Sequence, residues 1–248
     1  MRKGILTIVD GIDGSGKGTI VKALADWAKA KKLKVLDLKE YWKAKHTFPE
    51  PEEIKKFDCI VSAEPTFSMV GQAIREEIIK DNGRHYSAFT TAESFALDRE
   101  ILYRRIIIPA LLQGKYIFQE RGVTTSLIYQ PIQKEPLSLQ KILNLSGNKL
   151  AIKYQPDLLI ITQVEPETAV KRLAERDKKD GTIFEKLPFL KKSNKRFSAP
   201  WFCKIFETHG TKVVYLKTNK TVYDTIEEAI DIWEKYLISH NNKVRSAK

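Results

Sequence analysis

The chain has 248 residues, of which 42% are hydrophobic, and carries a formal net charge of +12 at pH 7. This length supports one substantial core, and α/β domains of this size commonly remain single. No apolar run approaches the roughly 18 residues of a membrane span, and the N-terminal region lacks the hydrophobic segment of a signal peptide. The cysteines, Cys59 and Cys203, form no recognisable disulfide framework or metal site. We therefore expect a soluble, cytoplasmic protein.

The positive charge is spread along the chain, with modest clusters at residues 29–34, 191–196 and 243–248. Clustered cations favour nucleic acids through counterion release, but no nucleic-acid-binding motif accompanies these clusters. We interpret the charge as a solvated, lysine-rich surface that also favours polyanionic nucleotides. Neither a membrane nor a nucleic acid is expected as a partner.

Short apolar runs predict six strands, at residues 5–9, 35–38, 59–62, 115–119, 157–162 and 212–216. Helical patterns lie between most of them, and this alternation predicts a three-layer α/β domain over residues 1–238, with a parallel sheet between helices. Residues 39–58 contain too few apolar side chains for a core of their own, which indicates a polar or short helical insert. Residues 239–248 are almost entirely polar and are expected to form a frayed tail.

A glycine-rich segment directly follows the first apolar run: Gly11-Ile12-Asp13-Gly14-Ser15-Gly16-Lys17-Gly18-Thr19. The amphipathic pattern after it predicts a helix. A strand, a glycine turn and a helix in this order are typical of a P-loop, in which backbone N–H groups and a lysine hold nucleotide phosphates. We predict a P-loop NTPase fold in which all nine residues bind ATP. The alternative interpretation is a glycine turn without a ligand, since Gly18 stands where a Ser or Thr usually follows the lysine.

Residues 172–195 are dense in charge, and Asp180-Gly181 offers a break within them. One interpretation is an exposed helix pair joined by a turn. The other is a mobile lid that closes over the phosphates and brings cations to the transferred group. In a P-loop kinase the second interpretation is favoured.

Three further groups of residues follow in order. They are Ala63-Glu64-Pro65-Thr66 with Gly71-Gln72-Ala73-Ile74-Arg75, then Phe95-Ala96-Leu97-Asp98-Arg99, then Glu120-Arg121 with Ser126-Leu127-Ile128-Tyr129-Gln130. Together with the P-loop, in this order and spacing, they resemble the thymidylate kinase family over most of the chain. The resemblance implies an ATP- and Mg²⁺-dependent kinase that converts dTMP to dTDP, and a homodimer.

The resemblance also implies roles for individual residues on the substrate side. Phe95 would stack on the thymine ring, Arg99 and Arg75 would contact the base or the acceptor phosphate, and Arg121 would engage that phosphate. The remaining substrate-binding positions are Glu64 and Pro65 beside the nucleoside, and Ser126, Tyr129 and Gln130 facing the base and sugar. Each has a structural alternative, because Phe95 suits a core and Arg75 or Arg99 suits a surface ion pair.

The predicted catalytic set is Lys17, Asp13, Arg121 and Arg176, and the predicted metal ligands are Thr19 and Asp13. Phosphoryl transfer requires cations where negative charge spreads over the transferred group, and the P-loop offers only Lys17. Arg176 is chosen from the family's lid region as the additional cation. The alternatives in that region are Arg172, Lys178 and Lys179.

Four departures from the family pattern keep other functions open. Besides Gly18, Ala63 stands where the family usually has Arg, Glu120 where it has Asp, and Gly122 where it has Tyr. Glu-Arg also occurs in deoxynucleoside kinases, whose acceptor is a hydroxyl group. The alternatives are therefore a deoxynucleoside kinase, another nucleoside monophosphate kinase, or a nucleotide-binding protein with little turnover.

Overall fold

The computed structural model describes residues 4–175 and 182–246. Its six strands form one parallel sheet in the order β2-β3-β4-β1-β5-β6. The strands are β1 (Ile5–Gly11), β2 (Val35–Asp37), β3 (Cys59–Ala63), β4 (Tyr116–Glu120), β5 (Leu158–Gln163) and β6 (Lys212–Lys217). All six predicted strands are confirmed, and so is the α/β fold.

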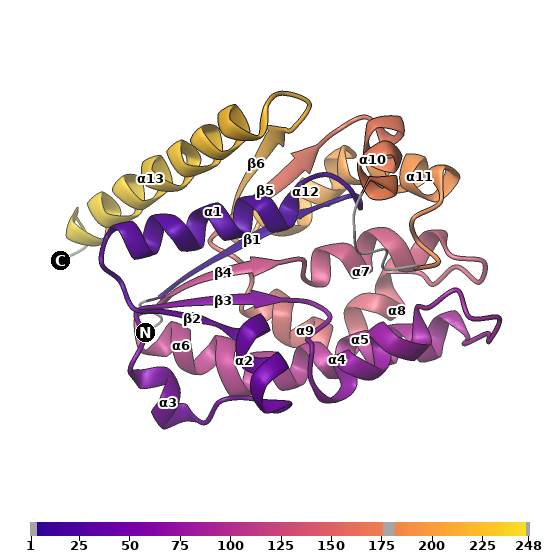
Figure 1. Cartoon of the computed structure of the whole chain (residues 1–248), viewed down its shortest axis with the longest axis horizontal. Helices are drawn as coiled ribbons and strands as arrows, with labels where there is room; N and C mark the ends of the chain where they lie inside the picture. The colour runs from indigo at the N-terminus through magenta and orange to yellow at the C-terminus, as the bar shows by residue number, and fades with distance from the viewer. Residues whose placement is uncertain (1–3, 176–181, 247–248) are drawn as a thin grey trace.

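Helices cover both faces of the sheet (Figure 1). They are α1 (Lys17–Ala30), α2 (Leu38–Lys45), α3 (Pro51–Lys55), α4 (Met69–Ala73), α5 (Ala88–Leu102), α6 (Ile108–Leu112), α7 (Val123–Tyr129), α8 (Leu139–Asn144), α9 (Ser146–Lys153), α10 (Pro166–Ala174), α11 (Leu187–Phe197), α12 (Pro200–Glu207) and α13 (Val222–Ser246). A π-helical turn, Tyr103–Ile107, joins α5 to α6, and another, Ile74–Ile78, follows α4.

The two faces of β1 show why the sheet needs two helical layers. Ile5 and Val9 pack with α1 and α13, whereas Leu6 and Ile8 belong to the larger core on the opposite face. Successive residues of a strand point to opposite faces, so an unbroken apolar run buries both of them. In Figure 1, α1 and α13 cross one face, and α5, α6 and α9 lie on the other.

The insert at residues 39–58, predicted to be either a polar or a short helical segment, is helical. It contains most of α2 and all of α3, and its side chains Trp42 and Ile54 are fully buried in the larger core. At the other end of the chain, α13 continues to Ser246, within the stretch for which the sequence predicts a frayed tail. Extending a packed helix adds one hydrogen bond for each residue that is fixed, which favours continuation beyond the buried turns.

The sheet order reverses direction at the carboxyl end of β1. From β1 the chain moves to the β2 edge and returns through β3 to β4, and from β4 it crosses to β5 on the other side of β1. Ligands in open α/β sheets bind where the connections diverge in this way.

Among the described residues, no helix combines the length and apolarity needed to cross a membrane.

We predict that Trp233→Ala lowers the free energy of unfolding by about 3–5 kcal/mol, the usual range for a buried aromatic residue. Trp233 is fully buried, and its ring centroid lies 5.0 Å from that of Phe118 and 5.5 Å from that of Trp27. Urea unfolding followed by far-UV circular dichroism measures the change. Tyr223→Ala on the same helix is the control, because Tyr223 is 68% exposed and its loss should stay within about 0.5 kcal/mol. Equal effects of the two substitutions would contradict the packing of α13 on the sheet.

Candidate active site

The glycine-rich turn joins β1 to α1 as the sequence predicted. Gly14 and Gly16 both have left-handed backbone conformations, with φ of 81° and 89°, and α1 begins at Lys17. A Cβ at Gly14 would lie 2.4 Å from the carbonyl oxygen of Ala169, whereas one at Gly16 would meet none of the described residues within 4 Å. The turn is therefore closed by α10 at Gly14 and open at Gly16. The first backbone N–H groups of α1, which no described side chain caps, follow this open position and suit an anionic ligand.

Asp13 is the meeting point of three predicted site residues. Lys17 is only 4% exposed; its Nζ donates to the carbonyl oxygen of Ile12 at 2.7 Å and lies 3.8 Å from Asp13 Oδ1. The Arg121 guanidinium forms an ion pair with the same Asp13 oxygen, and the Tyr129 hydroxyl donates to Oδ2 at 3.4 Å. Lys17 and Arg121, which are far apart in the sequence, thus lie together beside the glycine turn. Phosphate oxygens bound there would contact both cations.

Asp10, near the end of β1, holds the glycine turn in place, and it was not predicted from the sequence. Its carboxylate is fully buried near the end of β1, where it accepts hydrogen bonds from the Thr124 and Thr125 hydroxyls and from the backbone N–H of Gly11. It thereby joins the glycine turn to the start of α7. A carboxylate within an otherwise apolar strand was the available signal, because a buried charge requires partners.

The Glu64 and Arg99 side chains form a buried ion pair. Glu64 is 3% exposed and Arg99 1%, and Arg99 Nη2 lies 2.6 Å from Glu64 Oε2. Arg99 also donates to the Asn148 side chain and to Ser126 Oγ. Burial raises the pKa of the Glu64 carboxyl, while the Arg99 guanidinium and the Gln119 amide oppose that shift. The Arg99 guanidinium thus binds mainly other side chains of the protein, although the resemblance implies a contact with a ligand.

The neighbouring Asp98, which belongs to the sequence group at residues 95–99 but received no role there, binds the turn that follows β3. Its carboxylate accepts from the backbone N–H of Thr66 at 2.8 Å and from the Thr66 hydroxyl at 2.6 Å. Arg75 approaches the turn from α4's continuation: its guanidinium stacks 3.7 Å from the Phe67 ring centroid, and Nε donates to the Pro65 carbonyl oxygen at 2.9 Å. The segment after β3 is therefore fixed by α5 and by Arg75 together.

The remaining predicted substrate residues lie on α5 and around α7. Phe95 is half-buried and packs against the larger core, whereas Ser126 and Gln130 are almost fully buried. Tyr129 packs against Phe184 and Phe189, with ring centroids 5.3 and 5.0 Å away, and burial raises the pKa of its hydroxyl. Thr19 is exposed in the first turn of α1.

Comparison with known proteins supports the resemblance found in the sequence. A family model described as thymidylate kinase matches residues 51–230. The chain belongs to the thymidylate kinase family. The match begins after the glycine turn, so the assignment of the turn as a P-loop depends on its sequence and geometry.

Two of the curated relatives extend over nearly the whole chain. A probable thymidylate kinase of Archaeoglobus fulgidus is 30% identical and covers 94% of this chain and 96% of its own length. A thymidylate kinase of Mycoplasmoides gallisepticum is 25% identical, with coverage of 95% and 98%. One from Aster yellows witches'-broom phytoplasma is 26% identical, with coverage of 71% and 84%. Members of this family are phosphotransferases, and their reaction is nucleotide phosphoryl transfer.

Two departures from the family pattern are neighbours in the structure. A Cβ at Gly18 would lie 3.3 Å from Glu120 Oε2, so the absence of a side chain at residue 18 leaves room for the longer acid at residue 120. At the third departure, a Cβ on Gly122 would lie 3.0 Å from Ile8 Cδ1. A larger residue at position 122 would therefore require Ile8 to move.

The predicted lid segment, residues 172–195, begins in α10 and ends in α11. Lys191 on α11 pairs with Glu167 on α10 at 2.6 Å, as expected of two adjacent helices. The guanidinium of Arg172 donates to the Thr218 carbonyl oxygen at 2.7 Å, just beyond β6. The other lid candidates, Arg176, Lys178 and Lys179, lie outside the described residues.

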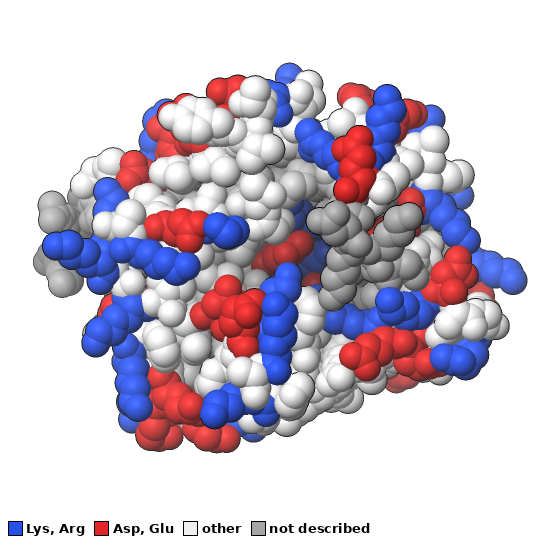
Figure 2. Space-filling view, viewed as in Figure 1, with Lys and Arg blue, Asp and Glu red and all other residues white. Residues whose placement is uncertain are grey.

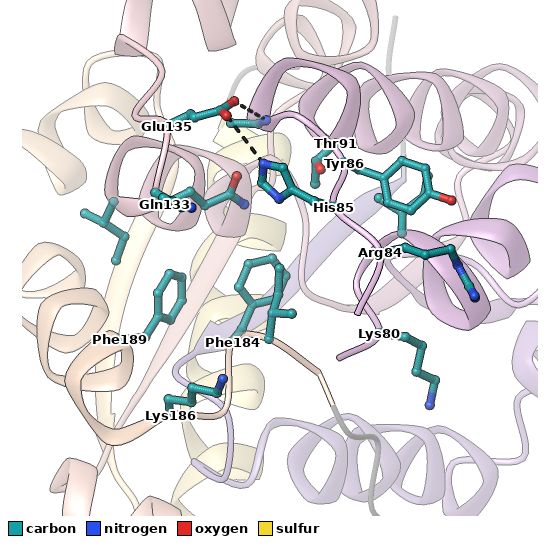
Figure 3. Close-up of a pocket in the computed structure, with 15 residues that line it drawn as sticks. Lys80, Arg84, His85, Tyr86, Thr91, Gln133, Glu135, Phe184, Lys186 and Phe189 are labelled. Atoms are coloured by element: carbon teal, nitrogen blue, oxygen red, sulfur yellow. Dashed lines mark hydrogen bonds and ion pairs between the residues drawn. The ribbon is translucent and has the colours of Figure 1, made fainter. Parts of the chain in front are cut away.

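A cavity of about 370 Å³ lies between residues 78–86, the start of α5, residues 132–135 and residues 183–189 (Figure 3). Phe184 and Phe189 form part of its apolar wall and separate it from Tyr129. It is also lined by the cationic side chains Lys80, Arg84, Lys134 and Lys186. None of the described catalytic, metal or substrate-binding residues predicted from the sequence lines this cavity, but Phe184, Lys186 and Phe189 belong to the predicted lid segment. Elsewhere on the surface seen in Figure 2, Lys and Arg are interspersed with Asp and Glu.

We predict that Lys17→Ala abolishes useful phosphoryl transfer without unfolding the protein. Removing one preorganised electrostatic contact commonly costs about 2.7–4 kcal/mol, a hundred- to thousandfold in rate. ADP release measures the rate, and circular dichroism checks the fold. Lys22→Ala is the matched control, because Lys22 lies on the same helix in an exposed pair with Asp26. Near-normal turnover of a folded Lys17→Ala variant would contradict the assignment as a P-loop.

Proposed function

We propose that this protein transfers the terminal phosphoryl group of ATP to dTMP, giving ADP and dTDP. The observation that carries the proposal is the convergence of Lys17 and Arg121 on Asp13, at the glycine turn that follows β1. A kinase of this class holds two polyanions with their reacting ends nearly in line, so it needs cations from separate elements at one point. Membership of the family supplies the choice of dTMP as acceptor.

On the donor side, the open backbone at Gly16 and the start of α1 would hold the ATP phosphates. The Lys17 ammonium, released from the Ile12 carbonyl, would follow the charge that develops on the transferred group. Thr19 and Asp13 fit Mg²⁺, since Mg²⁺ prefers oxygen ligands and is usually held by one or two protein groups with substrate phosphates. When bound, the ion would neutralise charge on the phosphate oxygens.

On the acceptor side, Arg121 would exchange its contact with Asp13 for the dTMP phosphate. Its planar guanidinium offers two parallel donors to phosphate oxygens and keeps its charge at every relevant pH. Tyr129 already touches Asp13 and would lie beside the sugar. The roles of Phe95, Arg75, Arg99, Ser126 and Gln130, the homodimer and the cytoplasmic location stay predictions from the sequence.

We predict that dTMP is the best acceptor, that dUMP is weaker and that ribonucleotides are poor. A methyl group in a pocket contributes only about 1–3 kcal/mol, so dUMP should be disfavoured and still used. The measurement is ADP release with ATP-Mg²⁺ and a panel of nucleosides and monophosphates. Phosphorylation of thymidine without that of dTMP would replace this proposal with a deoxynucleoside kinase. Absence of turnover with every acceptor would favour a nucleotide-binding protein instead.

We predict that Arg176→Ala lowers kcat strongly while changing the affinity for ATP little. This pattern is expected when a cation contacts the phosphoryl group chiefly in the transition state. Arg172→Ala is the matched comparison on the same segment, because Arg172 already binds the Thr218 carbonyl. Steady-state kinetics and ATP binding are measured for both variants. A larger loss of kcat in Arg172→Ala would transfer the role to Arg172, and unchanged kinetics in both would contradict a cationic lid at either position.

A further inference from the structure

A continuous chain of buried polar groups connects α9 to the backbone of Arg121. Asn148 on α9 binds Arg99, Arg99 binds Glu64, and Glu64 Oε1 accepts from Gln119 Nε2 at 3.0 Å. The same Gln119 nitrogen donates to the Arg121 carbonyl oxygen at 2.9 Å. The side chains of Asn148 and Gln119 are 0% exposed, so water does not compete for these bonds.

The surroundings fix the orientation of both amides. Asn148 Nδ2 donates to the Ile142 carbonyl oxygen at 2.7 Å, which leaves Oδ1 to accept from Arg99. Gln119 Nε2 faces two acceptors, whereas Oε1 has no hydrogen-bond partner among residues 4–175 and 182–246. Turning the Gln119 amide over would set its oxygen against the Glu64 carboxylate and the Arg121 carbonyl. The unpartnered Oε1 is thus the cost of holding those two groups with one nitrogen.

Arg121 needs such support because its backbone is strained. Its φ of 64° lies in the left-handed region, which is unfavourable for a residue with a side chain and persists only when the surroundings hold it. Its N–H donates to the Val9 carbonyl oxygen at 3.0 Å, and its carbonyl oxygen accepts from Gln119. This conformation directs the guanidinium to Asp13.

We propose that Gln119 and Asn148 are positioning residues that set the conformation of Arg121, and through it the binding of the acceptor phosphate. Gln119 acts directly on the Arg121 carbonyl. Asn148 acts at the far end, where it holds the Arg99 guanidinium against Glu64. The proposal depends on the role given to Arg121 in the proposed function, but it does not depend on which base the acceptor carries.

The close contact between α9 and α5 supports a role for Asn148 as an anchor. A Cβ on the preceding Gly147 would lie 1.8 Å from the Ala96 carbonyl oxygen, so only glycine permits this approach of the two helices. The approach brings Asn148 to Arg99 on α5. An amide at this depth is held in one place by backbone on one side and by a charged partner on the other.

The test is a double-mutant cycle between Gln119 and Arg121. We expect Gln119→Met to lower kcat/KM for dTMP by about tenfold, with KM for ATP changed less than about twofold. In the Arg121→Ala background the same substitution should change kcat/KM less than about twofold, because its effect is carried by Arg121. Equal losses in the two backgrounds, or no loss in the single variant, would overturn the proposal.

Gln155→Met is the matched control for loss of stability. Gln155 is also a buried glutamine that donates to a backbone carbonyl, that of Phe206, but it lies just before the start of β5, at the opposite end of the strands from the glycine turn. It should lower the unfolding temperature and leave kcat/KM for dTMP unchanged. A loss of kcat/KM in this control equal to that of Gln119→Met would overturn the assignment, since destabilisation alone would then explain both.

Asn148→Ala tests the far end of the chain, and it decides the question if Gln119→Met does not fold. It should lower kcat/KM for dTMP in the same selective way, and this loss should likewise vanish in the Arg121→Ala background. An equal loss in both backgrounds would overturn the role of Asn148. Wild-type turnover of dTMP is measured first and tests the proposed function by itself. If the wild-type enzyme prefers another acceptor, the cycle is run with that acceptor.

Discussion

The buried ion pair between Glu64 and Arg99 constrains the arrangement of the elements around the site. Each charge removed from water costs several kcal/mol unless its partner and its remaining hydrogen bonds are in place. Here those partners come from α7, α9 and β4, through Ser126, Asn148 and Gln119. Because a shift of any one element would leave a buried charge without its partners, the pair permits few alternative arrangements. The buried ion pair therefore fixes the position of the loop after β3 relative to the residues after β4.

Much of the fold could be predicted because its signals are local. The six strands are apolar runs that are buried on both faces, and the glycine turn needs left-handed positions that only a few residue types adopt readily. The last helix was less predictable. Its polar end follows from the packing of residues such as Trp233, which lie two turns earlier along the chain, and not from the composition of the tail.

Site residues could be predicted from the sequence where they belong to a motif. Residues that only hold such a motif in place could not. Asp10 and Asn148 each hold a predicted segment, and both are 0% exposed. Their partners are distant in sequence, so composition and spacing carry no sign of the pairing. The compensation between Gly18 and Glu120 is of the same kind. Read separately they are two departures from the family, whereas in space the small residue accommodates the longer acid.

Asp13 contacts the two cations, Lys17 and Arg121, that would bind phosphate. With no phosphate beside them, Lys17 and Arg121 would place two positive charges next to each other in a partly buried site, and the carboxylate between them offsets that repulsion. A phosphate must therefore compete with an internal carboxylate for the same cations. A ligand that carries more negative charge than Asp13 prevails in that competition, so the arrangement favours polyanionic nucleotides over singly charged ligands. The left-handed backbone of Arg121 and the burial of Lys17 place both cations beside the glycine turn.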